Sequence, residues 1–262
     1  MKLFKIAIPV ILLFFLLGFQ VNAKVVDTED TISLWVGDSR TVLIYQDLNM
    51  KSKKGISYRS KARVEGRFLM LKYRDCYAGR GTGYNFVRNG ISKVRKTVRK
   101  KGRQNVIFSS GVNDIYNPSL HPFSSTISPE SLVVKYWELY KNQCIKKYPE
   151  DHFYIQSINP IYKPLYYRGH SVTNEKIKRF NKKMKSLIKH SKYKNVKYID
   201  TYKNIFVKEK LINKKKTYRY ALKYRKMKVR YMRESSSFQL HYSTKVDKKI
   251  YRYVNQCIQY DR

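Results

Sequence analysis

The sequence predicts an α/β protein, a three-layer α/β/α sandwich around a five-stranded parallel sheet with flavodoxin-like strand order. Short apolar runs recur along the chain, and several are continuous rather than alternating, as in strands buried on both faces of a parallel sheet. Longer segments with helical spacing separate these runs, as crossover helices separate parallel strands. The five expected strands are Thr31–Val36, Phe68–Tyr77, Asn105–Ser109, His152–Ile158 and Asn195–Asp200.

The clearest expected helix runs from Asn174 to His190. Asn174 is a good N-cap residue, and Glu175 suits the positive end of the helix dipole in the first turn. Lysines occupy most of the helix surface, where we expect them to be solvated. The remaining apolar residues form one stripe that we expect to face the core: Ile177, Phe180, Met184, Leu187 and Ile188.

In a sheet of this kind the ligand binds outside the carboxyl ends of the strands. Several of the expected strands are followed by polar or glycine residues that fall at this edge. These first candidates for a functional site are Ser39, Gly83, Asn113 and Asn159.

Residues 1–23 differ from the rest of the chain. Lys2 and Lys5 precede an apolar stretch from Ile6 to Phe19, and Val21-Asn22-Ala23 offers small residues at the positions that a signal peptidase reads. The stretch is shorter than the about 20 residues that span a bilayer. We therefore expect a cleaved signal peptide over residues 1–23, with an uncleaved N-terminal anchor as the alternative. Residues 24–262 are then expected to form a single secreted or cell-surface domain without a stable membrane span.

The chain is strongly basic, with a net charge of +38. Between Lys176 and Arg233 it carries 23 Lys or Arg residues and two acids, Asp200 and Glu209. Such a concentration of positive charge attracts polyanions, because their binding releases counterions. For an exported protein we expect anionic polymers, such as glycans or teichoic acids, to bind the basic surface Lys176–Arg233. Compositional drift towards Lys and Tyr is the alternative explanation of the charge.

The three cysteines, Cys76, Cys144 and Cys257, are too few and too scattered for a disulfide framework or a zinc site. We expect buried free thiols, with a single disulfide as the alternative.

Three motifs suggest a function. Gly37-Asp38-Ser39-Arg40 and Gly111-Val112-Asn113-Asp114 each follow an apolar run, and Leu240-His241-Tyr242-Ser243 lies near the C-terminus. In this order they resemble the SGNH/GDSL hydrolase family. The resemblance extends from about Ser33 to the C-terminus, and it favours a secreted bacterial subgroup with GDSR in place of GDSL. Further segments that support this subgroup are Ser157–Pro160, Asn174–Asn181 and Tyr198–Tyr202.

The resemblance implies the SGNH hydrolase fold and a role for each matched residue. Ser39 would be the nucleophile and His241 the general base. The Asn113 side-chain amide and the Gly83 backbone N–H would stabilise the oxyanion, with Gly79 and Gly81 as alternatives to Gly83. No metal or organic cofactor is implied.

The chain departs from the family pattern at the acid of the triad. The family places an aspartate three residues before the histidine, where this chain has Phe238, and Gln239 replaces the glycine that follows. Phenylalanine cannot accept the imidazole N–H or stabilise an imidazolium. Three explanations stay open. Another acceptor orients His241 (a backbone carbonyl, Ser235–Ser237 or Glu234), the protein is a pseudoenzyme, or the local sequence is aberrant.

The function that the resemblance implies is a secreted serine esterase that hydrolyses acyl esters, mainly O-acetyl groups, on a cell-surface or environmental glycan. The first rival is a catalytically impaired binding protein for anionic polymers. The second is a secreted nucleic-acid-binding protein, which the basic and tyrosine-rich composition suggests. Because the chain has no recognised nucleic-acid motif, we do not expect nucleic acid as its physiological partner.

Overall fold

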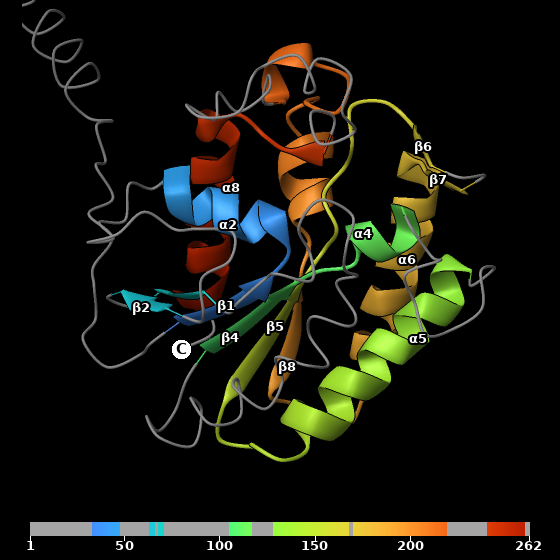
Figure 1. Ribbon diagram of the computed structural model, residues 1–262. Coiled ribbons are helices and arrows are strands. Elements are labelled where there is room, and N and C mark those ends of the chain that lie inside the picture. Colours follow the sequence, from blue (N-terminus) through green and yellow to red (C-terminus); the bar gives the residue numbers. More distant parts are fainter. Residues whose placement is uncertain are drawn as a thin grey trace, which may run out of the picture. The chain divides into compact units, whose positions relative to one another are not determined.

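The structure is a computed structural model of the 262-residue chain (Figure 1). It describes residues 33–47, 63–65, 68–70, 105–116, 128–167, 170–218 and 240–259. All of these lie in one compact unit, Thr31–Arg262. The expected signal peptide over residues 1–23 lies outside the described residues, so the signal peptide and the single domain over 24–262 stay predictions.

Six strands form one sheet in the order β2-β3-β1-β4-β5-β8. β1 lies between β3 and β4, and every pair from β3 to β8 is parallel, which is the flavodoxin-like order. The predicted fold class is therefore confirmed. The parallel strands are β1 (Ser33–Gly37), β3 (Phe68–Met70), β4 (Asn105–Ser109), β5 (His152–Gln156) and β8 (Val196–Ile199).

The sixth strand, β2 (Arg63–Glu65), pairs antiparallel with β3 at the edge of the sheet. This strand is not predicted from the sequence, because three residues with a charge at each end show no strand pattern. The expected strand Phe68–Tyr77 is a strand over Phe68–Met70, and its remainder lies outside the described residues.

Helices cover both faces of the sheet (Figure 1). On one face α2 (Ser39–Asp47) packs against α8 (Thr244–Gln259), and on the other α5 (Pro129–Tyr140) packs against α6 (Asn174–Lys189). This arrangement is the expected three-layer sandwich. The shorter elements are α4 (Val112–Tyr116), the antiparallel pair β6 (Leu165–Tyr167) and β7 (His170–Val172), the π-helices η3 (Lys141–Ile145) and η4 (Tyr202–Val207), and the 3-10 helix η5 (Lys215–Thr217).

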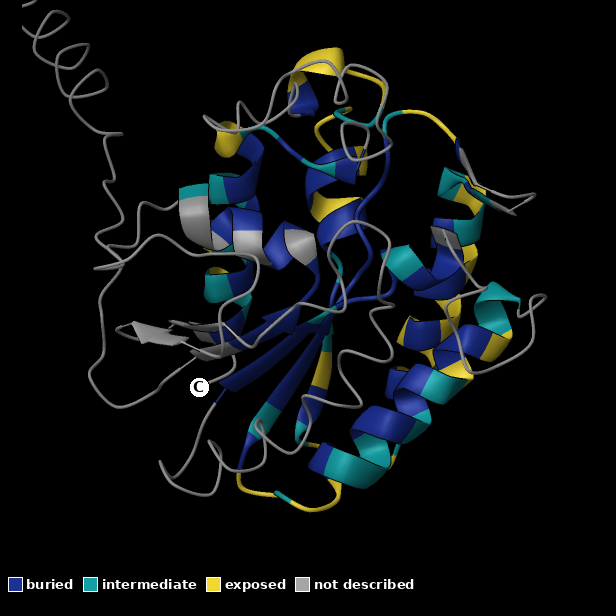
Figure 2. Ribbon diagram, viewed as in Figure 1, coloured by how far each residue is buried: buried dark blue, intermediate teal, exposed yellow. Residues whose placement is uncertain are grey.

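The middle of the sheet is buried under both helical layers, as Figure 2 shows in dark blue. Phe108 of β4 stacks on Tyr140 of α5 with ring centroids 4.1 Å apart. On the other face, Trp35 of β1 stacks on Tyr251 of α8 at 5.7 Å. The aromatic rings thus join each helical layer to the sheet, which explains why strand residues are apolar on both faces.

The helix expected over Asn174–His190 is α6, but its N-cap is different from the expected one. Thr173 is the N-cap, and its Oγ1 accepts from the Lys176 N–H at 3.2 Å. The Asn174 side chain instead bonds both backbone groups of Ile161, at 2.9 and 3.0 Å. Asn174 therefore anchors the helix to the chain that follows β5. The predicted apolar stripe faces the core, with Leu187 half-buried and the other four members buried.

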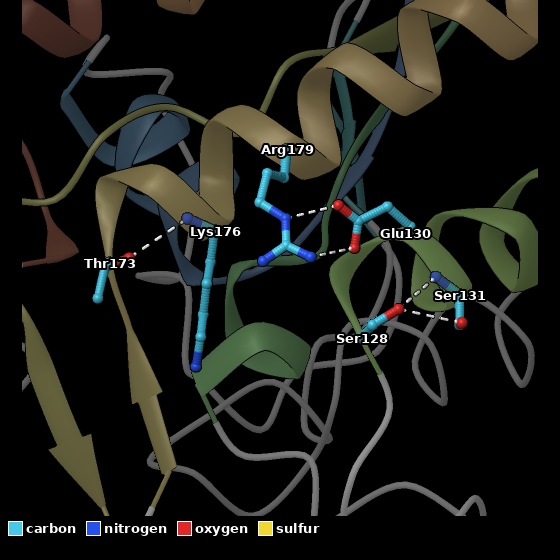
Figure 3. A network of polar contacts seen from close by, with 6 residues as sticks. All are labelled: Ser128, Glu130, Ser131, Thr173, Lys176 and Arg179. Atoms are coloured by element: carbon cyan, nitrogen blue, oxygen red, sulfur yellow. Dashed lines mark hydrogen bonds and ion pairs between the residues drawn. The ribbon is translucent and has the colours of Figure 1, made fainter.

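Polar contacts join the first turn of α5 to the second turn of α6 (Figure 3). Arg179 of α6 donates through Nε and Nη2 to the Glu130 carboxylate of α5, at 2.6 and 2.9 Å. Ser128 caps α5, because its Oγ accepts from the Ser131 N–H at 3.1 Å. The bidentate pair lowers the pKa of Glu130 below its ordinary value, chiefly through the Arg179 hydrogen bonds.

Within the described residues, Cys144 and Cys257 are not joined in a disulfide, and Cys144 is buried whereas Cys257 is half-buried. Cys76 lies outside them, so its state stays a prediction. None of the helices that the structure describes combines the length and the apolar character that crossing a membrane requires.

Candidate active site

The turn from β1 into α2 requires a glycine. A Cβ on Gly37 would lie 2.0 Å from Thr41 Oγ1 and 2.5 Å from the Ser109 carbonyl oxygen, far inside van der Waals contact. Asp38 then caps α2, with its Oδ1 accepting from the Arg40 N–H at 2.9 Å. The glycine and the cap place Ser39 at the first position of α2, directly where the strand meets the helix.

Asp38 is buried beneath this turn, with 2% of its surface exposed. Burial raises the pKa of the Asp38 carboxyl, because removal from water disfavours the charged form. The neighbouring Arg40 charge and the Arg40 N–H bond oppose this shift, but burial outweighs them. Asp38 is therefore a structural group of the turn.

The turn after β4 brings Asn113 to the same edge. The Asp38 N–H donates to the Ser109 carbonyl at 3.3 Å, which joins the ends of β1 and β4. Gly111 has a φ of +128°, a conformation that side-chain-bearing residues rarely adopt. Asn113 is the second residue of α4 and half-buried. Asp114 accepts from the Tyr136 hydroxyl of α5, which fixes the helix that carries Asn113.

His241 lies in a short segment just before α8, and the residues on both sides of it are held. The Leu240 carbonyl accepts from Arg40 Nε at 2.9 Å, and Tyr242 forms an isolated β-bridge with Tyr218. Leu240 and Tyr242 are buried, whereas His241 is half-buried. The backbone that carries His241 is thus tied to the turn that carries Ser39.

The Tyr242 hydroxyl donates to the Pro160 carbonyl at 2.5 Å. Burial raises the pKa of the Tyr242 phenol well above its ordinary value, although the nearby Arg40 charge acts in the opposite direction. The hydroxyl therefore keeps its proton at neutral pH and remains a donor.

The loop after β5 lies beside the Ser39 turn and is part of the candidate site. Asn159 is buried, and its Oδ1 accepts from Thr201 Oγ1 at 2.6 Å. Thr201 Oγ1 also contacts Ser157 Oγ at 2.9 Å and accepts from Gln156 Nε2 at 3.2 Å. The Asn159 carbonyl accepts from Arg40 Nη1 at 2.8 Å. The loop is therefore joined both to η4 and to the Ser39 turn.

Three of the four residues with a predicted catalytic role are described. The backbone of Ser39, Asn113 and His241 lies at the carboxyl edge of the sheet, in segments joined by the hydrogen bonds above. Gly83 and Phe238 lie outside the described residues. The catalytic roles of Ser39, Gly83, Asn113 and His241 stay predictions. In the described part of the chain, no cluster of three or more His, Cys, Asp or Glu residues could hold a metal ion.

The sequence motifs did not reveal the contacts of Arg40 or Thr201. Arg40 joins the Ser39 turn to the His241 segment and to the loop after β5, and Thr201 joins that loop to the start of η4. Arg40 had a detectable signal, because a cation in the first turn of a helix opposes the helix dipole. An arginine at that position indicates that a partner outside the helix holds it. Thr201 had no comparable signal.

No protein-family model and no curated protein matches the chain. Among solved structures, a candidate platelet activating factor from Streptococcus pneumonia is similar to it with a TM-score of 0.52 and 14% sequence identity. The match covers 96% of this chain and 98% of that protein. The chain has the SGNH hydrolase fold. At this identity the similarity shows the fold alone.

Two further structures are similar to the chain, each with a TM-score of 0.49. A carbohydrate esterase family 3 protein from Talaromyces cellulolyticus has 12% identity, over 87% of this chain and 97% of that protein. Est24, a carbohydrate acetylesterase from Sinorhizobium meliloti, has 11% identity, over 89% of this chain and all (100%) of its own length. The strand order of this chain is the one expected from its sequence. Ser39 begins the helix that follows β1, as expected for the Gly37–Arg40 motif.

Proposed function

We propose that this protein is a secreted serine esterase of the SGNH type that removes acyl groups, mainly O-acetyl groups, from a cell-surface or environmental glycan. One observation carries the proposal. The side chain of Arg40, the residue after Ser39, bonds the carbonyl of Leu240, the residue before His241, across 200 positions of sequence. A nucleophile and its base must lie within hydrogen-bond reach of each other, and this bond supports such a pairing.

In the proposed reaction, Ser39 Oγ attacks the ester carbonyl while His241 takes the hydroxyl proton. The Asn113 amide and the backbone N–H groups of Gly83 and Ser39 stabilise the oxyanion of the tetrahedral intermediate. When the intermediate collapses, His241 returns the proton to the leaving sugar oxygen, and an acyl-enzyme remains on Ser39. Water activated by His241 then releases the carboxylic acid and restores the serine.

The exposed surface favours an anionic carrier for the acyl group. Five lysines of α6 are solvent-exposed, and Figure 2 shows exposed segments of this helix in yellow. These residues lie in the basic surface Lys176–Arg233 and are Lys178, Lys182, Lys183, Lys185 and Lys189. Multiple exposed cations bind a polyanion by releasing its counterions, so we propose that the carrier is an anionic polymer.

The test is hydrolysis of short-chain aryl esters and of an O-acetylated glycan by the wild type and by Ser39→Ala. We expect measurable turnover by the wild type and its loss in the variant, together with covalent labelling of Ser39 by a fluorophosphonate. Turnover that survives in Ser39→Ala would contradict the assignment of the nucleophile.

The position of the missing acid offers a second test. A carboxylate at residue 238 would fix the imidazole tautomer and stabilise the imidazolium in the transition state. The double variant Phe238→Asp, Gln239→Gly should therefore raise kcat/KM. An unchanged rate in a folded, active double variant would indicate that His241 has another orienting partner.

The second candidate function is a binding protein for anionic polymers that has lost catalysis, and the exposed lysines of α6 favour it. The two functions separate in one comparison. An esterase turns over esters and depends on Ser39, whereas a binding protein retains salt-sensitive polymer binding and is inert on every ester, with or without the restored acid.

A further inference from the structure

Arg40 is a buried cation with an unusual set of partners. Its side chain leaves α2 and donates to three backbone carbonyls, those of Leu240 at 2.9 Å, Asn159 at 2.8 Å and Pro160 at 3.4 Å. The guanidinium carbon also lies 5.1 Å from the ring centroid of Tyr242. Only 7% of Arg40 is exposed. A desolvated charge is costly unless it is fully hydrogen-bonded, so these contacts indicate a specific arrangement.

The contacts converge on one short segment. Two of the partners, Leu240 and Tyr242, directly flank His241. The other two, Asn159 and Pro160, belong to the loop after β5. Tyr242 closes the arrangement, since its hydroxyl bonds the Pro160 carbonyl that also accepts from Arg40 Nη2. We name Arg40 and Tyr242 together the Arg40–Tyr242 clamp.

We propose that Arg40 is the positioning residue of His241: through the Arg40–Tyr242 clamp it fixes the backbone on both sides of the imidazole relative to Ser39. This inference rests on the proposed function. Arg40 itself touches no reacting atom, because its guanidinium is occupied by backbone carbonyls. A planar guanidinium suits this task, since its donors point in several fixed directions at once.

The clamp also bears on the absence of an aspartate at position 238. In a complete triad the aspartate side chain orients the imidazole by accepting a hydrogen bond from its N–H. Here residue 238 is Phe. The segment is held instead by Arg40 at the Leu240 carbonyl and by the Tyr242 side chain, which contacts the Arg40 guanidinium and bonds the Pro160 carbonyl. Such anchoring restricts the backbone of the His241 segment, which lowers the cost of reaching the productive geometry.

The test compares Arg40→Met and Arg40→Lys with the wild type. Met removes every donor at similar length, whereas Lys keeps the charge but not the planar fork. We expect Arg40→Met to lower kcat about 10²-fold with KM within about twofold, because misplacement by about 1 Å has that effect on a reacting pair. Arg40→Lys should lose less. The matched control is Arg252→Met, which removes an exposed arginine of α8 outside the basic surface Lys176–Arg233 and should leave kcat unchanged.

Amide hydrogen exchange provides a readout that does not depend on activity. The Ser243 N–H bonds the Thr217 carbonyl at 2.9 Å and reports on the segment that carries His241. We expect it to exchange at least about tenfold faster in Arg40→Met than in Arg252→Met, because local opening governs exchange.

Tyr242→Phe serves if the Arg40 variants do not fold, since it removes a single hydroxyl and its bond to Pro160. We expect a several-fold loss of kcat and faster exchange at Ser243. Folded clamp variants whose kcat and Ser243 exchange both match the wild type would overturn the proposal. An inert wild type with the expected exchange change would count against the esterase function but support the clamp as a fixed structural unit.

Discussion

Thr201 offers the sharpest stability test of the loop that borders the candidate site. The residue has no exposed surface, and its Oγ1 serves three polar side chains: it donates to Asn159 Oδ1, accepts from Gln156 Nε2 and contacts Ser157 Oγ. Thr201→Val keeps the shape of the side chain and removes all three contacts.

The expected magnitude follows from these contacts. A net hydrogen bond contributes about 1 kcal/mol, and a buried polar group left without its partner costs about 1–3 kcal/mol. Ser157 Oγ still accepts from the Tyr202 N–H at 2.8 Å, which limits the loss at that group. We therefore expect the free energy of unfolding to fall by about 3 kcal/mol, which corresponds to a decrease in Tm of about 6–12 °C for a domain of this size.

Thr217→Val is the matched control. Thr217 is also buried, with 2% exposed, and its Oγ1 donates to the Leu211 carbonyl at 2.9 Å. Its substitution should cost about 1 kcal/mol. Thermal unfolding followed by circular dichroism measures both variants. If Thr201→Val lowers the free energy of unfolding no more than Thr217→Val does, the three contacts of Thr201 do not act together.

Three further predictions concern other parts of the molecule. Gly111→Ala should destabilise the fold by about 1–3 kcal/mol in urea unfolding, because φ is +128° and the new Cβ would lie 2.7 Å from Ile158 Cδ1. Arg179→Met should raise the pKa of Glu130 towards 4.5 in an NMR titration; since folding lowers this pKa, the stabilisation is present above the unfolded value and is lost as pH falls through the folded one. Asn113→Ala should lower kcat about 10²–10³-fold if Asn113 is an oxyanion donor, whereas a loss below a few-fold in a folded variant would leave it a turn residue.

The sequence was sufficient for the architecture because the sheet is buried on both faces. Continuous apolar runs such as Val106–Phe108 are then required, and they are visible without a structure. The helix α6 was equally clear, since its apolar stripe repeats at helical spacing. The edge strand β2 was missed because three residues with a charge at each end show no alternating or continuous apolar pattern.

Local capping was harder to predict than the elements themselves. Thr173 and Asn174 are both good N-cap residues, and propensity cannot choose between neighbours. The choice depends on Ile161, whose backbone N–H and C=O are both satisfied by the Asn174 side chain. That contact spans 13 positions, so it exists only once the fold has formed.

The same limit explains why the motifs around Ser39 and His241 could be recognised but their connection could not. A turn such as Gly37-Asp38-Ser39 is encoded locally, by a glycine that must lie close to Thr41 and by an aspartate that caps the next helix.

The connection between the two motifs is made by a side chain whose partners are backbone carbonyls. Any residue supplies a backbone carbonyl, so no residue type at positions 159, 160 or 240 reveals that Arg40 will bond there. The exposed lysines of α6 act differently. They lie in water, where their attraction is screened over about 8 Å at physiological salt, so they suit recognition of a polymer rather than of one oxygen atom. Arg40 is desolvated and acts through direct hydrogen bonds, which added salt screens far less. Salt should therefore weaken polymer binding at the lysines while the geometry that Arg40 maintains around His241 is preserved.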